Sequence, residues 1–229
     1  MRLERSENLD FLDLRSLFPP RVAAFFLVSR HERPGSEEIK NFLEHAGLPV
    51  SAIHAPRQVH SAEIFEGCGN RECDGSFTRK AGEAVTVAAA DCVPILISAN
   101  EGGAVMALHA GWKGTLGKIA EKAGRHFDPM SFDRVWIGPS IRKCCYKVGD
   151  ERIRSFKETF PRTPAVDEED KTLDLPLMNA GIFLGMGVPE DRIVIDGRCA
   201  CCSPGRFASY RRDGDRAGRM IAVGMLLDL

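Results

Sequence analysis

Short apolar runs separated by polar and turn-forming residues dominate the chain. Runs rich in β-branched and aromatic residues predict strands at residues 22–29, 84–89, 93–98, 104–109, 134–137 and 192–196. Apolar positions at helical spacing, bounded by Gly, Pro, Ser or Asp, predict helices at residues 36–46, 115–127, 150–160 and 175–185. The apolar tail, residues 220–227, fits either a closing strand or a short helix.

Strands and helices follow one another without a regular βαβ alternation. This order predicts a mixed α+β fold rather than a doubly wound parallel sheet. No repeat stands out, and no stretch is rich enough in Pro, Gly or Ser to act as a linker. We therefore expect residues 1–229 to form a single domain. The charged segment 162–171, RTPAVDEEDK, is expected to be a solvated loop.

The composition narrows the class of partner. The 229 residues are 44% hydrophobic and 28% charged, which is ordinary for a globular protein, and the net charge is −1. A nearly neutral chain favours a small-molecule substrate over nucleic acid. The apolar run 22–28 is too short to span a membrane, and the residues before it do not resemble a secretory signal. We expect a cytoplasmic protein; the oligomeric state is not indicated.

The chain contains eight cysteines, and without a secretory signal free thiols or metal ligands are expected rather than disulfides. No two C-x-x-C pairs combine into a zinc framework, so a structural four-cysteine site is not predicted. The sequence assigns no role to four of the cysteines, which are Cys144, Cys145, Cys201 and Cys202.

Three motifs at the ends of predicted strands contain good zinc ligands: His60 in RQVHS, Cys92 in ADC and His109 in LHAGWKG. They are too far apart in the sequence for a local zinc finger, so the fold has to bring them together. Two imidazoles and one thiolate leave a fourth position open, which is typical of a catalytic zinc ion. Such an ion makes hydroxide from water near neutral pH or polarises a substrate oxygen.

Other interpretations of these residues stay open. A single buried cysteine or histidine is more often a core residue than a ligand. Cys92 beside one histidine also suits metal-free nucleophilic catalysis, such as amide hydrolysis of cell-wall precursors. One cysteine and two histidines resemble a type 1 copper site. A multicopper oxidase needs many H-x-H pairs, however, and none of the six histidines is so paired.

Two segments contain candidates for binding an anion. In LHAGWKGT an apolar strand ends in a glycine-containing turn, where backbone N–H groups and Lys113 suit a phosphate, although a plain strand–helix turn is the simpler interpretation. The segment SYRRDGDRAGR, residues 209–219, carries arginines among aspartates. Such mixed charge usually marks a solvated loop, but the arginine fork suits phosphate or carboxylate.

Five motifs occur together in one order: QVHS, ADCVPILI, LHAGWKGT, GPSIRKCCYKVGDE and CACCSPGRFASYRRDGDRAGRM. This set, spanning residues 57–220, resembles the YfiH family, long labelled laccase-like polyphenol oxidoreductases and now understood as zinc-dependent purine nucleoside phosphorylases with adenosine deaminase activity. The resemblance implies a packed mixed β core flanked by helices, similar to the catalytic domain of the cytotoxic necrotizing factor. It implies that His60, Cys92 and His109 hold catalytic Zn²⁺, with copper as the alternative.

The resemblance also implies the reaction. Phosphate would cleave adenosine, inosine or methylthioadenosine, and adenosine would also be deaminated. Arg57, Lys113 or Arg211 would hold phosphate or ribose oxygens, and Asp91 would orient a neighbouring ligand or the loop. The chain departs from the family pattern at Ser61, where glycine is usual, and at Lys113, where arginine is usual. Lysine keeps the charge but loses the bidentate fork.

Overall fold

The computed structural model describes residues 3–5, 9–29 and 33–228. Within these residues the chain forms two six-stranded mixed sheets and a small hairpin of β11 (Val166–Asp167) and β12 (Thr172–Leu173). The first sheet has the order β1 (Glu4–Arg5), β2 (Asp10–Asp13), β3 (Val22–Ser29), β14 (Arg219–Leu226), β7 (Glu83–Ala89), β4 (Ala52–His54). The second has the order β13 (Ile193–Ile195), β10 (Phe132–Ile137), β8 (Val93–Ala99), β9 (Ala104–Ala110), β6 (Gly75–Thr78), β5 (Ile64–Glu66).

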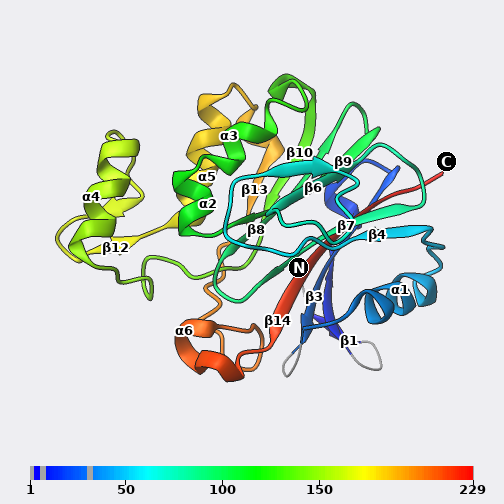
Figure 1. Cartoon of the computed structure of the whole chain (residues 1–229), viewed down its shortest axis with the longest axis horizontal. Helices are drawn as coiled ribbons and strands as arrows, with labels where there is room; N and C mark the ends of the chain where they lie inside the picture. Colours follow the sequence, from blue (N-terminus) through cyan, green and yellow to red (C-terminus); the bar gives the residue numbers. More distant parts are fainter. Residues whose placement is uncertain (1–2, 6–8, 30–32, 229) are drawn as a thin grey trace.

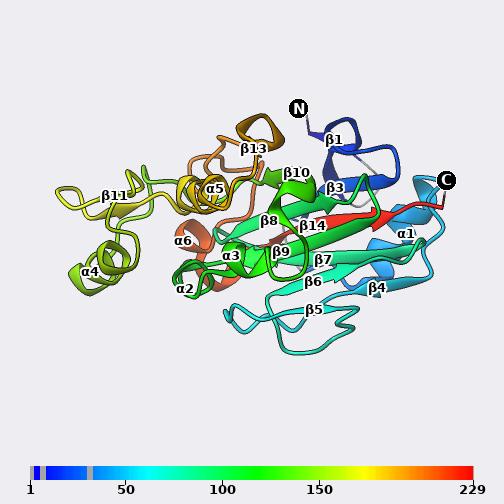
Figure 2. The same ribbon diagram turned by 90° about the horizontal axis from the view of Figure 1, so that it is seen from above.

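Helices lie on the outer sides of both sheets (Figure 1). The α-helices of the described residues are α1 (Ser36–His45), α2 (Trp112–Leu116), α3 (Ile119–Ala123), α4 (Asp150–Thr159), α5 (Leu175–Gly185) and α6 (Tyr210–Asp213). Of these, α4 packs against α2 and β11, and α6 lies near the start of β14 (Figure 1). In both views α4 and the β11–β12 hairpin lie at the opposite end of the molecule from α1 (Figures 1 and 2). None of the helices in the described part of the chain has the length and apolar character needed to cross a bilayer.

The two sheets pack face to face over a shared apolar layer. Phe26 of the first sheet meets Trp136 of the second edge to face, with ring centroids 5.3 Å apart. Both side chains are fully buried. Gly224 in β14 allows the sheets to approach, because a Cβ there would lie 2.6 Å from Cγ2 of Val105. This layer joins the sheets into one interior.

The outer face of each sheet is covered by helices. Helix α1 packs Ile39, Phe42 and Leu43 on the first sheet, because its apolar residues recur at helical spacing on one side. The short helices α2 and α3, together with α5, cover the outer face of the second sheet. The order of layers is therefore helix, sheet, sheet, helices, which confirms the predicted α+β fold with a packed mixed β core.

The predicted strands are confirmed, with shifts of up to two residues at their ends, and the apolar tail is strand β14. The single helix predicted over 115–127 is wrong. Lys118 has a φ of 58° and separates α2 from α3. The preceding Gly117 lies close to the segment before β5, since a Cβ there would lie 2.9 Å from Cβ of Ala62. The charged segment 162–171 is also more ordered than predicted, because it contains β11.

Candidate active site

The three predicted metal ligands lie at one edge of the second sheet. Cys92 directly precedes β8, and His109 is the penultimate residue of β9. Because β8 and β9 are antiparallel, with Pro94 opposite His109, the start of one strand and the end of the other share an edge. His60 reaches this edge from the loop between β4 and β5. The ligand atoms of the three side chains all lie within 4.8 Å of one another.

The ligand group is buried on one side and open on the other. Sγ of Cys92 lies 4.0 Å from Nε2 of His60. The rings of His60 and His109 meet edge to face, with centroids 5.0 Å apart. His109 is buried, Cys92 is half-buried and His60 is exposed. A reactant can therefore reach the group from the side of His60.

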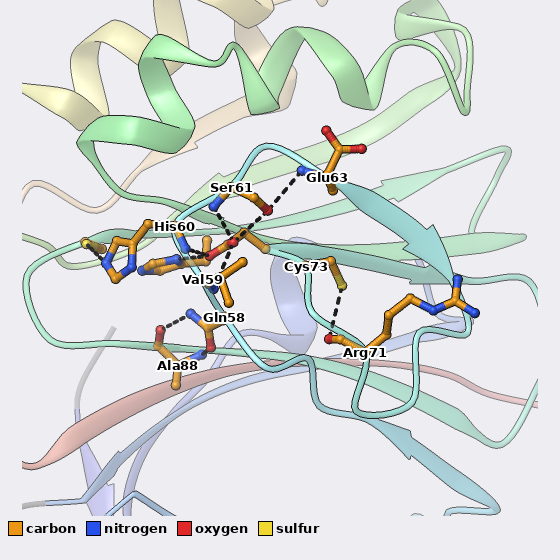
Figure 3. Close-up of polar contacts among 11 residues, drawn as sticks. Gln58, Val59, His60, Ser61, Glu63, Arg71, Cys73 and Ala88 are labelled. Carbon is orange, nitrogen blue, oxygen red and sulfur yellow. Dashed lines mark hydrogen bonds and ion pairs between the residues drawn. The ribbon is translucent and has the colours of Figure 1, made fainter.

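A buried aspartate, Asp74, positions two of the ligands. Its Oδ1 accepts hydrogen bonds from Nδ1 of His109 at 2.7 Å and from the backbone N–H of His60 at 3.1 Å. Its Oδ2 accepts from the backbone N–H groups of Val59 and Ser61, at 3.2 and 2.6 Å, and from the Ser61 hydroxyl at 2.9 Å (Figure 3). These donors replace the water that the fully buried carboxylate has lost.

Strand pairing explains why Asp74 meets His109. Asp74 directly precedes β6, in which Gly75 lies opposite Leu108 of β9. The backbone N–H of His109 donates to the carbonyl of Asp74 at 2.7 Å, so the two residues are neighbours across the sheet. Glycine is required at position 75, because a Cβ would lie 2.7 Å from Cγ1 of Ile64 and 2.8 Å from Cδ2 of Leu108.

Gln58 fastens the same loop to the first sheet. Its side-chain amide donates to the carbonyl of Ala88 at 2.7 Å, and its Oε1 accepts from the Ala88 N–H at 2.8 Å (Figure 3). The side chain therefore pairs with β7 as the backbone of a neighbouring strand would. Neither Gln58 nor Asp74 was predicted as a site residue. Their only signal in the sequence is their place in QVHS and CDG, which does not reveal their partners.

Electrostatics favours a charged pair in the metal-free site. Burial raises the pKa of the Cys92 thiol, but His109 and His60 outweigh burial and lower that pKa to about 6. Burial lowers the pKa of His109, but the Cys92 thiolate and the Asp74 carboxylate outweigh it and raise that pKa to about 9. Between these two values a thiolate therefore faces an imidazolium.

The donor set fits a thiophilic metal ion. Because Nδ1 of His109 donates to Asp74, Nε2 is the ring atom left for a cation. A carboxylate behind the ring is the usual partner of a metal-bound histidine. Gly111 leaves room for the ligands, because a Cβ there would lie 2.9 Å from Sγ of Cys92. One thiolate and two imidazoles beside open space suit zinc or copper with a coordination position left for a reactant.

The ligands line a pocket of about 460 Å³, a size suited to a small molecule. Three arginines, Arg33, Arg211 and Arg219, also line it. Tyr146 and Tyr210 add aromatic surface. Positive charge, aromatic rings and metal ligands thus meet in one space, which suits a substrate that is anionic at one end and planar at the other.

The three residues expected to bind phosphate lie in different places. Arg211 lines the pocket that contains the metal ligands. Arg57 forms an ion pair with Glu72 and lines an adjoining hollow of about 650 Å³. That hollow shares Arg33 with the pocket. Lys113 is exposed on α2 and does not belong to the described lining of the pocket.

Asp91 contacts the loops rather than a metal ligand. Its φ is 91°, which side chains with a Cβ rarely adopt. Its Oδ2 accepts from the backbone N–H of Arg211 at 2.6 Å, and its carbonyl accepts from the N–H of Ile141 at 2.9 Å. Arg211 and Ile141 both line the pocket. Of the two roles expected for Asp91, these contacts favour orienting the loop.

We expect Asp74→Asn to weaken Zn²⁺ binding by about 10- to 100-fold, the usual effect of losing the partner of a metal-bound histidine. An amide carries no charge, and in either orientation its NH₂ faces hydrogen-bond donors and cannot accept from them. Competition with a chromophoric chelator measures the dissociation constant. Glu72→Gln alters an exposed carboxylate in the same segment and is the matched control. Equal dissociation constants for Asp74→Asn and the unaltered protein would contradict the positioning role.

We expect Zn²⁺ binding at about pH 7.5 to release about one proton from the site, because metal ligands bind deprotonated. At this pH the Cys92 thiol has already lost its proton, since its pKa is about 6, whereas His109, with a pKa of about 9, still carries one. Affinity should therefore rise with pH up to about 9 and fall more steeply below about 6. Calorimetry in buffers of different ionisation enthalpy counts the protons.

The same titration of Cys92→Ala supplies the background from any other Zn²⁺ site. Release of no proton from the site at about pH 7.5, after this subtraction, would show that the thiolate–imidazolium pair does not form.

Known proteins resemble this chain over most of its length. The family model described as multi-copper polyphenol oxidoreductase laccase matches residues 31–227. Purine nucleoside phosphorylase YlmD of Geobacillus stearothermophilus is 37% identical over 80% of this chain and 75% of that protein. Adenosine deaminase RL5, from an unknown prokaryotic organism, is 32% identical over 76% of this chain and 74% of that protein.

The fold agrees with these sequence comparisons. The crystal structure of YlmD from Geobacillus stearothermophilus superposes with a TM-score of 0.82 and 28% sequence identity, covering 99% of both chains. The resemblance carried by the five motifs is thus confirmed. The chain belongs to the family described as multi-copper polyphenol oxidoreductase laccase, whose curated relatives include purine nucleoside phosphorylases and an adenosine deaminase.

Proposed function

We propose that this protein is a zinc-dependent purine nucleoside phosphorylase that also deaminates adenosine. The observation that carries the proposal is a pocket in which His60, Cys92 and His109 stand beside three arginines and two tyrosines. The names of the two relatives, phosphorylase and deaminase, support the same pair of reactions. Both reactions act on a small nucleoside, which matches the size of the pocket.

The arginines form the proposed phosphate site. Burial and the nearby charge of Arg219 lower the pKa of Arg33, so these two guanidinium groups repel each other. A phosphate between them would relieve this repulsion and accept charge-assisted hydrogen bonds. Arg211 lines the same pocket, and its backbone N–H donates to Asp91. Its guanidinium donates to the carbonyls of Cys145 and Lys147, and its remaining N–H groups can donate to a phosphate.

The remaining lining suits the nucleoside. Tyr210 is exposed and offers a face against which a purine can stack. The ring of Tyr146 is buried and has the guanidinium of Arg211 over it. Residues 88–90 line the same pocket with small alanine side chains that admit a flat base. Oδ1 of Asp91 is buried, and the described residues provide no hydrogen-bond partner for it, so it is free to accept from a ribose hydroxyl.

In phosphorolysis a phosphate oxygen forms a bond to C1′ of the ribose while the bond from C1′ to the purine nitrogen breaks. The bonding electrons leave with the base, which takes up a proton. The arginines hold phosphate near C1′, which makes the attack effectively intramolecular. When bound to His60, Cys92 and His109, a zinc ion would supply a Lewis acid at the pocket wall. Asp74 keeps the His109 ring oriented with Nε2 toward that position.

Metal-free hydrolysis by a cysteine is the second candidate, because Cys92, His109 and Asp74 are arranged like a nucleophile, a base and its orienting carboxylate. The position of His60 argues against it. Its ring lies 5.0 Å from that of His109 and would have no task in such a triad. Copper oxidation has less support, since the described lining contains no methionine to act as a weak axial ligand and its glutamine, Gln58, already pairs with the backbone of Ala88.

The test is to incubate the Zn²⁺-loaded protein with inosine, adenosine or methylthioadenosine and phosphate. We expect the free base together with ribose 1-phosphate, or the methylthio derivative of that sugar phosphate. Without phosphate, adenosine should yield inosine. Cys92→Ala should lose both reactions, because it removes the thiolate ligand. If protein with full zinc occupancy forms no base and no sugar phosphate at high concentration, the phosphorylase proposal fails.

We expect Arg33→Ala to raise the KM for phosphate by about tenfold or more, because it removes a charge-assisted hydrogen bond worth about 1.5–3 kcal/mol. The KM for the nucleoside should change much less. Initial rates at varied phosphate and fixed nucleoside measure the effect. Arg154→Ala, an exposed position on α4 outside the described lining, is the matched control. An unchanged KM for phosphate in Arg33→Ala would remove Arg33 from the proposed phosphate site.

A further inference from the structure

Four cysteines outside the active site bring their sulfur atoms together. Cys144 and Cys145 lie in the turn after β10, and Cys199 and Cys202 lie in the segment after β13. All four Sγ atoms lie within 4.8 Å of one another. Sγ of Cys202 is 3.5 Å from that of Cys144 and 3.2 Å from that of Cys145. The sequence did not predict a four-cysteine site, because an adjacent pair and one C-x-x-C are not a zinc framework on their own.

Strand pairing places the two segments side by side. Strands β10 and β13 are parallel, with Ile137 opposite Ile195. The pairing continues past the strand ends as a bridge between Ser140 and Cys199, and the N–H of Ala200 donates to the carbonyl of Ser140 at 2.9 Å. Because parallel strands end at the same edge of a sheet, both pairs of cysteines emerge together. The pairing of β10 with β13 therefore brings the four sulfur atoms together.

Two arginines from the following segment hold these turns. The guanidinium of Arg211 donates to the carbonyl of Cys145 at 2.8 Å. The guanidinium of Arg212 donates to the carbonyls of Ala200 and Cys201, at 2.9 and 3.2 Å. Both turns therefore have backbone contacts that fix their positions independently of the sulfur atoms. The thiols stand on a preformed frame.

We propose that Cys144, Cys145, Cys199 and Cys202 bind one structural Zn²⁺ ion. Zinc takes four thiolates in a tetrahedron with Zn–S bonds of about 2.3 Å, which places the sulfur atoms about 3.8 Å apart. The observed sulfur–sulfur separations, which include 3.2 and 3.5 Å and do not exceed 4.8 Å, bracket this value. A disulfide would use two of the sulfur atoms and leave two without a role, and it needs a separation of about 2.05 Å. Cys201 does not belong to the group.

The ion would stabilise one wall of the active-site pocket. Tyr146 directly follows Cys145, and Ile141 precedes the cysteine pair; both line that pocket. Arg211 connects the two places, since its side chain reaches Cys145 and its backbone N–H reaches Asp91. With four thiolates the site has no position for a reactant, so it supports structure rather than chemistry. The inference goes beyond the proposed function and does not depend on it.

The test uses full-length Cys92→Ala, which lacks the thiolate of the active site, purified under reducing conditions. Elemental analysis should find about one zinc per chain in this protein. Adding Cys202→Ser should remove it. Adding Cys201→Ser, the matched control, should leave it in place. After exchange for cobalt, the Cys92→Ala protein should show the strong near-ultraviolet absorption of thiolate-to-cobalt charge transfer, and Cys202→Ser should abolish this absorption.

A second measurement tests the proposal without the Cys202→Ser substitution, which could prevent folding. Stepwise addition of a mercurial to the Cys92→Ala protein should release the zinc as four thiols react, and a colorimetric indicator detects the release. The proposal is overturned if the Cys92→Ala protein holds no metal, if it holds iron instead of zinc, or if thiol counting and mass show a disulfide within the group.

Discussion

The carboxylate of Asp74 is the group on which the active site depends. It is buried away from water, and its negative charge is tolerated only because five hydrogen bonds converge on its two oxygens. These bonds come from the loop carrying His60 and from the ring of His109. One anion therefore joins a loop, the start of β6 and the end of β9 into a single unit. Ser61, where glycine is usual in the family pattern, adds a hydroxyl donor to that unit.

The geometry of the second sheet brings the functional groups to one edge. Strands β9, β8 and β10 are neighbours, and each adjacent pair is antiparallel. The end of β9, the start of β8 and the end of β10 consequently lie together. The end of β9 carries His109, Cys92 directly precedes β8, and the chain after β10 leads into Cys144 and Cys145. The active site and the four-cysteine group are therefore products of the same edge, made rigid by packing on both faces of the sheet.

Two residues at this edge have a backbone conformation that favours glycine. His60 and Asp91 both have positive φ values, 60° and 91°, in a region that residues with side chains rarely occupy. Such conformations persist only where surrounding contacts determine them, and they gather at functional sites. Here Asp74 holds the backbone of His60, and the carboxylate of Asp91 receives the N–H of Arg211. One of these conformations therefore belongs to a candidate metal ligand, and the other belongs to the residue that holds an arginine of the pocket.

The local pattern of the sequence was enough to predict the principal strands, most of the helices and three candidate metal ligands. Apolar spacing and turn residues act over a few positions, and the ligands stand in recognisable motifs. Three features appear only in the folded chain: Asp74 and Gln58 hold the candidate ligands, Lys118 interrupts a helix, and cysteines from two distant segments meet. These outcomes depend on which strands pair and in what register, and pairing is set by contacts between residues far apart in the chain.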